Sequence, residues 1–496
     1  MSPDDPHAWK VQLTAAILDV VAQGPDGDGT IFDELAFEVF AYQYANNEPY
    51  RGYCDALDKT PDAVSSWTDI PAYPTDAFKR EIVASFPTDE AVQAIMTSGT
   101  TSPNQRGRIF RDEQGQELIF TANRVMTGAY LFPDFEAGQR CRILLMTPGL
   151  DIAPTMGMAI GMDQTRQHFG TPDSMFLVKR SGVDVKRLVS ALRLAEESGV
   201  PIAIIGATSA YVYFFKACRD KGMRFRLPDG SRVCDGGGYR GRFGVVTRDD
   251  YYELVLDVLG VPAHHCVNTL GLGETATNYF DDTLRNHVVG AAEGRRHKVP
   301  PPWTRTQVFD MESGEVLPPG RVGLLRHYDL CNLPTVIGVQ SDNLGMMDDD
   351  GGFEIIGRAK IVDGKVQELP SEATVGPMGD TRVFRLLEAY VNFSIDFKMG
   401  RVSSEDSKAD YIELRRDADA RAGIDESDPT ASCPIAVEEI VAGADDPEAR
   451  KRADAAIAAF QRDAAGPDGD GATGSDVATL GGPAGDGSGG SEEGED

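Results

Sequence analysis

The chain has 496 residues, a formal net charge of -30 at pH 7 and a hydrophobic content of 41%, which allow roughly two to four domains, each with a core of its own. So acidic a surface repels phosphate backbones and anionic lipid headgroups, which argues against nucleic acids and membrane surfaces as partners. No apolar run reaches the ~18 residues of a membrane span, and nothing near the N-terminus has the basic flank and apolar stretch of a signal peptide.

The seven cysteines are scattered and form no Cys-x-x-Cys pair, which favours reduced thiols and a cytoplasmic protein. His264, His265 and Cys266 are adjacent residues of metal-binding types. Adjacent residues on a strand point to opposite faces, however, which argues against a shared metal ion at this place.

The N-terminal region, 1–85, is polar and predicted to be helical. Apolar residues recur at helical spacing from Trp9 to Ala22 and from Ile31 to Asn46, and each stretch predicts a helix. The segment Tyr50-Arg51-Gly52-Tyr53 is predicted to form a turn.

A hydroxyl-rich segment, Thr97-Ser98-Gly99-Thr100-Thr101-Ser102-Pro103, follows the apolar run 91–96, which predicts a buried strand. A strand that ends in a flexible loop of hydroxyls and glycine is typical of a phosphate-binding site, because backbone amides and hydroxyls both donate to the anion. An ordinary Ser/Thr turn is the alternative interpretation.

Strands and helices alternate over the next part of the chain. Buried strands are predicted at 142–146, 201–206 and 231–234, and helices at 117–131, 184–197 and 209–221. This alternation predicts an α/β fold with a mostly parallel sheet, whose ligands lie beyond the carboxyl ends of the strands. We therefore expect the hydroxyl-rich segment and the glycine-rich turn 235–239 at one edge of a single sheet.

The pattern changes after the pair Gly357-Arg358. Shorter helical and extended segments predict a small α+β domain over 358–463. Residues 464–496 are rich in glycine and acids, carry no base, and are predicted to be a disordered tail because they cannot bury a core.

Several short motifs occur in an order that resembles the adenylate-forming ligases. The hydroxyl-rich segment is followed by Gly-Gly-Gly-Tyr at 236–239, Gly-x-Gly-Glu at 271–274, Ser341-Asp342 and Gly357-Arg358. Within that superfamily the chain resembles the acyl-protein synthetases of bacterial bioluminescence, the fatty-acid–luciferin-component ligases. This narrower resemblance rests on the segments Asp235 to Tyr239, Tyr279 to Arg285, His297 to Trp303 and Leu333-Pro334-Thr335. The phenylacetate–CoA ligases are the nearest alternative.

The resemblance implies a large adenylate-forming domain with mostly parallel sheets over 86–357, followed by the small α+β domain. It implies an ATP- and Mg²⁺-dependent ligase that activates a carboxylic acid, a fatty acid in this family, as an acyl adenylate. The acyl group then passes to a protein or thiol acceptor. A non-catalytic nucleotide-binding homologue, and an aryl- or acyl-CoA ligase that uses CoA, are the alternatives.

The resemblance also assigns roles to single residues. Thr100, Glu274 and Arg358 take the catalytic positions, and Glu274 is the Mg²⁺ ligand. The residues that would bind the phosphates of ATP are Thr97, Ser98, Gly99, Thr100, Thr101 and Arg106. Those that would bind adenine are Gly237, Gly238 and Tyr239. Asp342 would bind the ribose, and Arg358 would bind the ribose or the phosphates.

The sequence departs from the family pattern at four places. Ser102 stands where glycine is usual, Arg106 stands near a usual lysine, and Gly273 stands where threonine precedes the acid. No cysteine follows Arg358 until Cys433, so the family's acceptor thiol is not found, and we expect an external thiol or amine to accept the acyl group. The C-terminal catalytic lysine that is typical of other adenylating ligases is not identified either; Lys360, Lys365 and Lys398 are the candidates.

Overall fold

The computed structural model describes residues 5–97, 107–179, 182–237, 247–291, 294–310, 312–362 and 365–368. The predicted tail and nearly all of the predicted domain at 358–463 lie outside these ranges. So do 98–106 and 238–246, which contain most of the hydroxyl-rich segment and the tyrosine of the glycine-rich turn. Within the described ranges, no helix is both long and apolar enough to cross a lipid bilayer.

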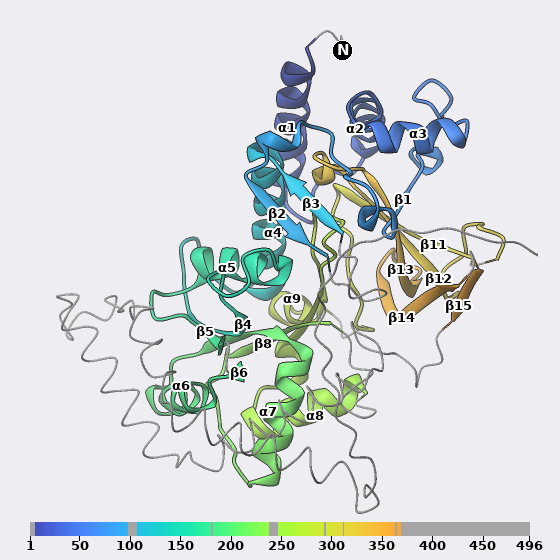
Figure 1. The fold of residues 1–496 in the computed structure, drawn as a ribbon. Helices are drawn as coiled ribbons and strands as arrows, with labels where there is room; N and C mark the ends of the chain where they lie inside the picture. Colours follow the sequence, from blue (N-terminus) through green and yellow to red (C-terminus); the bar gives the residue numbers. More distant parts are fainter. Residues whose placement is uncertain are drawn as a thin grey trace, which may run out of the picture. The chain divides into compact units, whose positions relative to one another are not determined.

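Three helices form the first part of the structure: α1 (Pro6–Ala22), α2 (Phe32–Asn46) and α3 (Glu48–Ala56) (Figure 1). The Asp5 side chain caps α1 by accepting hydrogen bonds from amides of its first turn. The predictions of α1 and α2 are confirmed, but the turn predicted at 50–53 is wrong because α3 occupies it. The Asn47 side chain accepts a hydrogen bond from the Tyr50 amide at 3.2 Å, and this cap outweighs the low helix propensity of Gly52.

Among the described residues, the largest sheet has seven strands in the order β10-β9-β8-β7-β4-β5-β6. The strands are β4 (Arg142–Pro148), β5 (Met175–Lys179), β6 (Gly182–Val183), β7 (Ile202–Ala207), β8 (Arg232–Gly236), β9 (Cys266–Leu270) and β10 (Tyr279–Phe280). All pairs are parallel except those of the edge strands β6 and β10. This confirms the predicted mostly parallel α/β sheet.

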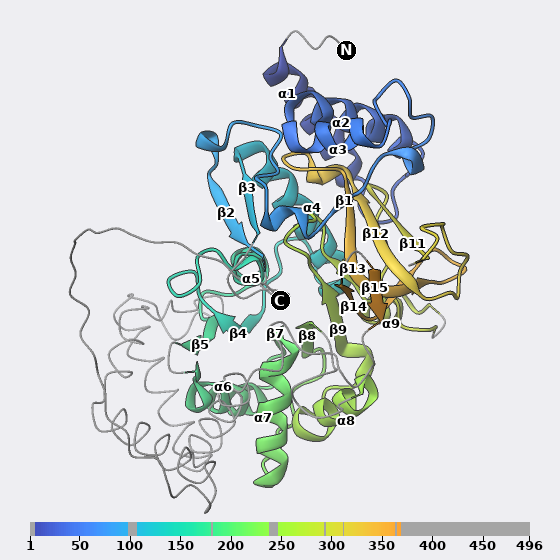
Figure 2. The ribbon, with the colours of Figure 1, turned by 45° about the vertical axis from the view of Figure 1, so that its right-hand side comes forward.

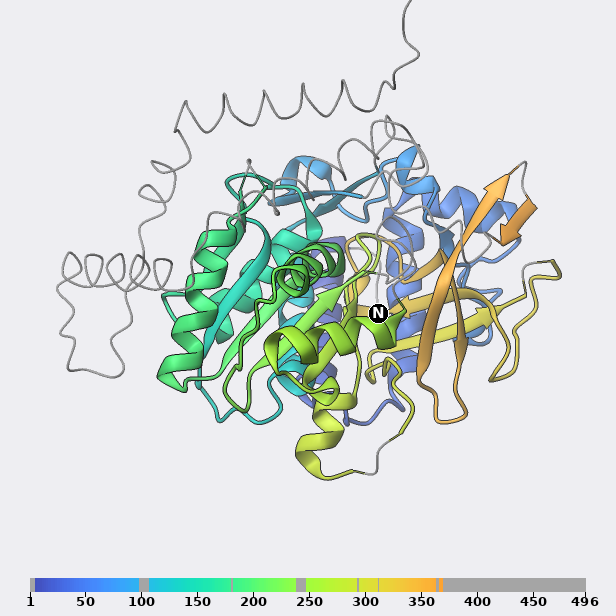
Figure 3. The ribbon, with the colours of Figure 1, turned by 90° about the horizontal axis from the view of Figure 1, so that it is seen from below.

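Helices cover both faces of this sheet: α4 (Glu113–Leu131), α5 (Gly157–Phe169), α6 (Val185–Ser198), α7 (Thr208–Asp220), α8 (Arg248–Leu259) and α9 (Thr283–Val289) (Figure 3). Alternate residues of β4 enter two different cores. Ile143 and Leu145 pack with the N-terminal helices and α4, whereas Leu144 and Met146 pack with α6, α7 and α8. Because both faces are buried, the strand is apolar from Ile143 to Met146.

A second sheet is mainly antiparallel and has the order β11-β12-β13-β14-β15, with β1 pairing in parallel with β13 (Figure 2). Its strands are β1 (Tyr73–Pro74), β11 (Thr304–Phe309), β12 (Gly323–Asp329), β13 (Gly338–Met347), β14 (Phe353–Val362) and β15 (Lys365–Glu368). Short 3-10 helices connect the elements: η1 (Trp67–Asp69), η2 (Ala77–Lys79), η3 (Thr88–Glu90), η4 (Ala263–His265) and η5 (Leu330–Asn332).

A separate antiparallel pair, β2 (Gln93–Met96) and β3 (Arg108–Arg111), flanks the hydroxyl-rich segment. Ile95 is deeply buried, while its neighbours in β2 are only half-buried. The expectation that this strand and the glycine-rich turn share one sheet is therefore wrong. The hydroxyl-rich segment begins directly after β2 of the two-stranded sheet, and the glycine-rich turn follows β8 of the seven-stranded sheet.

Candidate active site

The turn that carries Glu274 is held by side chains from three other segments. Asn332 donates a hydrogen bond to the Glu274 carbonyl oxygen at 2.9 Å, and Asn123 donates to the carbonyl oxygen two residues later at 2.8 Å. The Asp329 carboxylate accepts a hydrogen bond from the amide three residues after Glu274 at 2.7 Å. Because these bonds fix the backbone at Glu274 and in the residues that follow it, they restrict where the Glu274 carboxylate can lie before any ligand binds.

The Glu274 side chain lies among charged groups from other parts of the chain. Burial raises the pKa of its carboxyl to about 7, and the negative charge of Asp342 adds to the increase. Arg358 and Lys79 act in the opposite direction. The structure thus gathers three predicted site residues, Glu274, Asp342 and Arg358, together with Lys79, which the sequence analysis missed.

Asp342 and Arg358 come from neighbouring strands of the second sheet. Asp342 lies on β13 and Arg358 on β14, where the antiparallel register pairs Arg358 with the residue after Asp342. The Arg358 Nε atom lies 4.0 Å from an Asp342 carboxylate oxygen, and about a third of each side chain is exposed: 37% for Arg358 and 29% for Asp342. Both side chains are therefore accessible to a ligand at the site.

Lys79 ends η2, shortly before the hydroxyl-rich segment. Its ammonium group lies 3.1 Å from an Asp76 carboxylate oxygen, and only 12% of the Lys79 side chain is exposed. The sequence signal was weak, since a lysine in a Pro- and Asp-containing segment is most often a solvated surface residue. Its electrostatic contact with Glu274 becomes visible only when residues nearly two hundred positions apart are placed together.

Thr97 is the described residue of the hydroxyl-rich segment, and it lies beside the Glu274 turn. Its hydroxyl accepts a hydrogen bond from the Gly107 amide at 2.9 Å, so the two ends of the undescribed segment 98–106 meet here. A Cβ atom added to Gly273 would lie 3.6 Å from the Thr97 Cγ2 atom and 3.3 Å from the Ile109 Cδ1 atom. The β2–β3 pair therefore packs directly on the turn that carries Glu274.

Gly237 marks the start of the glycine-rich turn at the end of β8. Its φ of +118° lies in a region that L-residues with a side chain rarely adopt, so glycine is needed here. Its carbonyl oxygen accepts a hydrogen bond from the Asn268 side chain at 3.3 Å. Gly238 and Tyr239, like Ser98, Gly99, Thr100, Thr101 and Arg106, lie outside the described residues, and their roles stay predictions.

Thr275, the residue after Glu274, has a buried hydroxyl. Thr275 is 3% exposed, and within the described residues its hydroxyl has no hydrogen-bond partner. Gly273 leaves the preceding position without a hydroxyl, as the sequence analysis noted. A buried hydroxyl without a partner is costly, which is typical of a site that a ligand completes.

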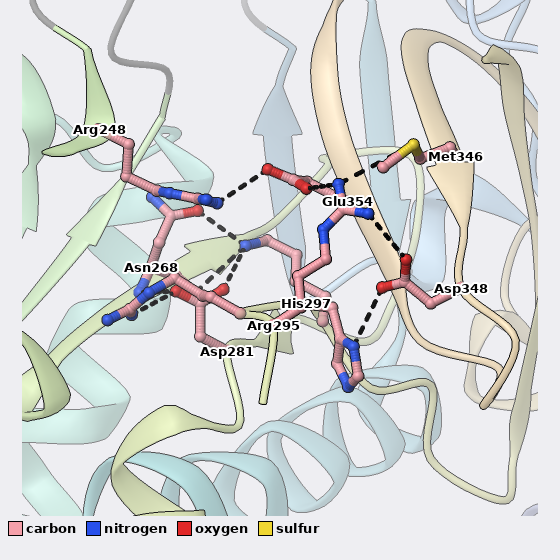
Figure 4. Close-up of polar contacts among 10 residues, drawn as sticks. Arg248, Asn268, Asp281, Arg295, His297, Met346, Asp348 and Glu354 are labelled. Carbon is pink, nitrogen blue, oxygen red and sulfur yellow. Dashed lines mark hydrogen bonds and ion pairs between the residues drawn. The ribbon is translucent and has the colours of Figure 1, made fainter. Parts of the chain in front are cut away.

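A buried polar network holds the turn at Gly237 through the side chain of Asn268. Lys298 donates to the Asn268 side chain at 2.8 Å and to an Asp281 carboxylate oxygen at 3.0 Å (Figure 4). Asn268 in turn donates to the Asp235 carboxylate at 2.9 Å, and Arg296 donates to Asp281 at 2.9 Å. All these groups are buried or nearly so, which makes the network stabilising only while each member keeps its partners.

Further ion pairs lie next to this network. Arg248 on α8 lies 2.8 Å from the Glu354 carboxylate of β14, and Arg295 contacts both Glu354, at 2.5 Å, and Asp348, at 3.3 Å (Figure 4). Arg248 belongs to a helix that covers the seven-stranded sheet and Arg295 to the loop after α9, whereas Glu354 belongs to the second sheet. These contacts therefore help to hold β14, the strand of Arg358, against α8 and this loop.

His297 connects the start of α9 with the turn after β13. Its ring nitrogens lie 3.4 Å from an Asp282 carboxylate oxygen and 3.1 Å from an Asp348 carboxylate oxygen, and Asp350 lies at 3.8 Å. The hydrogen bond to Asp282 is the largest cause that raises the pKa of His297 to about 9. The imidazole is therefore protonated at neutral pH.

Replacing His297 with glutamine should remove a stabilising contribution that depends on pH. Since the His297 pKa is raised from its ordinary ~6.5, the contribution is fully present below about pH 6.5 and is lost as the pH rises through about 9. We expect wild type to be about 2 kcal/mol more stable than His297→Gln at pH 6, with hydrogen bonds to a charged group as the source. Urea denaturation at several pH values measures this, and a difference that does not change with pH would contradict it.

The chain was compared with families of known proteins. Residues 17–368 match the family described as "Acyl-protein synthetase, LuxE". The long-chain-fatty-acid–luciferin-component ligase of Vibrio harveyi is 23% identical over 332 residues, which are 65% of this chain and 82% of that protein. The corresponding ligase of Aliivibrio fischeri is 23% identical over 321 residues, covering 64% of this chain and 79% of that protein.

Solved structures of similar fold include a 2-hydroxyisobutyryl-CoA ligase in an open conformation with 2-HIB-AMP and CoA. It is 13% identical, with a TM-score of 0.49, and the match covers 69% of this chain and 78% of that one. ATP-bound MatB from Rhodopseudomonas palustris is 14% identical with a TM-score of 0.38, covering 65% and 60% of the two chains.

Proposed function

Because the chain belongs to the acyl-protein synthetase family LuxE, whose members are acyl-adenylate-forming ligases, we propose that it uses ATP to activate a fatty acid and passes the acyl group to an external acceptor. The observation that carries this proposal is the gathering of Glu274, Asp342, Arg358 and Lys79 in one place. The names of the two bacterial ligases favour a long-chain acid as the substrate.

The proposed roles follow from the chemistry of these side chains. The Asp342 carboxylate is an acceptor only, and so suits the two hydroxyl donors of a ribose. Arg358 and Lys79 would neutralise phosphate charge, Arg358 in a forked geometry and Lys79 as a point charge. Thr97 would stand at the base of the loop that holds the β- and γ-phosphates.

The site also suits a magnesium ion. Burial and the negative charge of Asp342 raise the pKa of the Glu274 carboxyl, so a bound cation would stabilise its ionised form, and carboxylate with phosphate oxygens is the ligand set that Mg²⁺ prefers. When bound, Mg²⁺ would supply charge neutralisation at the phosphates of ATP. The fixed backbone of the Glu274 turn would keep its carboxylate in position for this role.

The proposed reaction has two steps. In the first, the carboxylate oxygen of the acid attacks the α-phosphorus of ATP, the bond to the bridging oxygen of the β-phosphate breaks, and pyrophosphate leaves. In the second, a thiol or amine attacks the acyl carbon of the adenylate and AMP leaves. The protein contributes positioning and charge neutralisation, which account for most of the catalysis in transfers of this kind.

The cysteines favour an external acceptor. Within the described residues, burial raises the pKa of the thiols of Cys54, Cys141 and Cys218 to about 12, and it raises those of Cys234, Cys266 and Cys331 as well. A thiol with so high a pKa is a poor nucleophile, because the thiolate is the reactive form. We propose CoA or a partner protein as the acceptor; Cys433 lies outside the described residues.

An ATP–pyrophosphate exchange assay tests the first step. The full-length protein is expected to exchange label only when Mg²⁺ and a suitable acid are both present, and a panel of aliphatic acids of increasing length, with aromatic acids alongside, identifies the substrate. ATP binding by calorimetry without exchange for any acid would instead support a non-catalytic nucleotide-binding protein. Intact mass after turnover shows whether an acyl group stays on the chain, and added CoA distinguishes the two external acceptors.

Replacing Lys79 with glutamine should lower kcat/KM for ATP by at least about tenfold, since the proposed site loses a fixed positive charge at the phosphates. Arg80→Gln is the matched control. Arg80 also pairs with Asp76, at 2.7 Å, but 62% of its side chain is exposed. Steady-state exchange rates at varied ATP concentration measure the effect, and equal losses in the two variants would contradict a role specific to Lys79.

A further inference from the structure

Three of the chain's seven histidines meet at the amino end of β9. His264 and His265 lie in η4, immediately before β9, and His287 lies in the last turn of α9. Each can offer one ring nitrogen, and these three nitrogens all lie within 4.8 Å of one another. The sequence argument against a shared metal ion assumed a strand at 264–265. The segment is a 3-10 turn, so that argument does not apply.

The contact made by His265 favours metal binding. His265 Nδ1 lies 3.0 Å from the Ser231 carbonyl oxygen. Because a carbonyl only accepts, Nδ1 carries the proton in this contact, and the neutral ring keeps a lone pair on Nε2. This is the arrangement by which protein carbonyls orient metal-binding histidines. The His264 and His287 rings are stacked, with centroids 3.9 Å apart.

The other histidine cluster differs in this respect. His297 already has one ring nitrogen near Asp348 and the other near Asp282, so both are engaged as donors. Such an imidazole has no lone pair for a metal ion. The cluster of 264, 265 and 287 therefore fits a metal better than the one at His297.

The histidine cluster is also distinct from the candidate active site. Ser231 and Cys266 stand at the amino ends of β8 and β9, while Gly237 and Glu274 follow the carboxyl ends of the same parallel strands. A metal ion at the cluster would join η4 to α9 at the amino ends of these strands, opposite the candidate active site. It would thus be separate from the Mg²⁺ of the proposed reaction.

We propose that His264, His265 and His287 bind one zinc ion, with water as the fourth ligand. Three imidazoles and an open position are a common tetrahedral set for Zn²⁺. With Zn–N distances of about 2.1 Å, tetrahedral geometry places the nitrogens about 3.4 Å apart, so nitrogens that lie up to 4.8 Å apart need to approach by up to about 1.4 Å. His287 is exposed on a short helix and has room for this adjustment.

Calorimetric titration of the metal-free, full-length protein with Zn²⁺ tests the proposal. Wild type is expected to bind one Zn²⁺ per chain at this cluster. His264→Ala and His287→Ala should each weaken that binding by at least about tenfold, since even the loss of an outer partner of a metal ligand usually costs 10–100-fold. His7→Ala is the matched control, because His7 is exposed on α1 and far from the cluster in sequence.

Two further measurements make the outcome decisive. Visible absorption of the Co²⁺ complex should have the strong bands of tetrahedral coordination in wild type and in His7→Ala, and lose them in His287→Ala. Thermal melting without metal shows whether each variant is folded. If one histidine variant is not folded, the Zn²⁺ affinity of the other variant tests the proposal. Absence of saturable Zn²⁺ binding, or the same affinity in wild type, His264→Ala and His287→Ala, would overturn the proposal.

Discussion

Replacing Glu274 with glutamine is expected to abolish ATP–pyrophosphate exchange, by at least about a hundredfold in kcat, while the fold becomes no less stable. Activity falls because the amide cannot supply the negative charge that holds a cation at the phosphates. The free energy of unfolding, by contrast, should not fall. The Glu274 pKa is raised to about 7, so the ionised carboxylate disfavours the folded state as the pH rises through that value. Glutamine removes this penalty.

The two effects are measured separately. Exchange rates at saturating acid report the loss of activity, and the Tm at pH 8 reports stability. Glu253→Gln is the matched control, because Glu253 is exposed on α8. Retained exchange in Glu274→Gln would remove Glu274 from the proposed site. A large fall in Tm would show that its role is structural.

Replacing Asp281 with asparagine should lower the free energy of unfolding by about 3–5 kcal/mol, because Lys298 and Arg296 would be left with buried charges and no carboxylate partner. Burial alone would raise the pKa of Asp281, but the two cations outweigh burial and hold the pKa below its ordinary value. The contribution of Asp281 is therefore present above about pH 4 and lost only as the pH falls through the lowered pKa.

Urea denaturation between pH 5 and 9 measures this loss, which should be nearly constant over the range. Asp257→Asn is the matched control. Asp257 pairs with Arg224 at 2.8 Å, but both side chains are about two-fifths exposed, so its loss should cost no more than about 1 kcal/mol. Similar losses in the two variants would contradict the proposed importance of the buried network.

The parts of the fold that could be predicted are those in which the burial of a segment determines the pattern of apolar residues within that segment. Strand β7 and the central residues 143–146 of β4 are apolar because helices cover both faces of their sheet, and the sequence has the same continuous apolar runs. The separate β2–β3 pair could not be predicted. Its strands are short and half-buried, and a local pattern does not tell which sheet a strand joins.

The candidate site also contains residues that the sequence indicates and residues that it does not. Glu274, Asp342 and Arg358 were found because each stands in a recognisable motif, and their proximity then agrees with the resemblance. Lys79 was missed because its partners are distant in the sequence. A charged residue inside an apolar strand, as Asp235 is in β8, was the one signal in the sequence that could have indicated the buried network.

The close packing of Gly273 against Ile109 restricts how this chain can change over evolutionary time. A side chain at 273 would place its first carbon 3.3 Å from the Ile109 Cδ1 atom, which is deeply buried and has little freedom to move. A side chain at 273 would therefore require the Ile109 side chain to shift by a few tenths of an ångström. The cost of a substitution at 273 thus depends on the residue at 109, and we expect the effects of changes at the two positions to be non-additive.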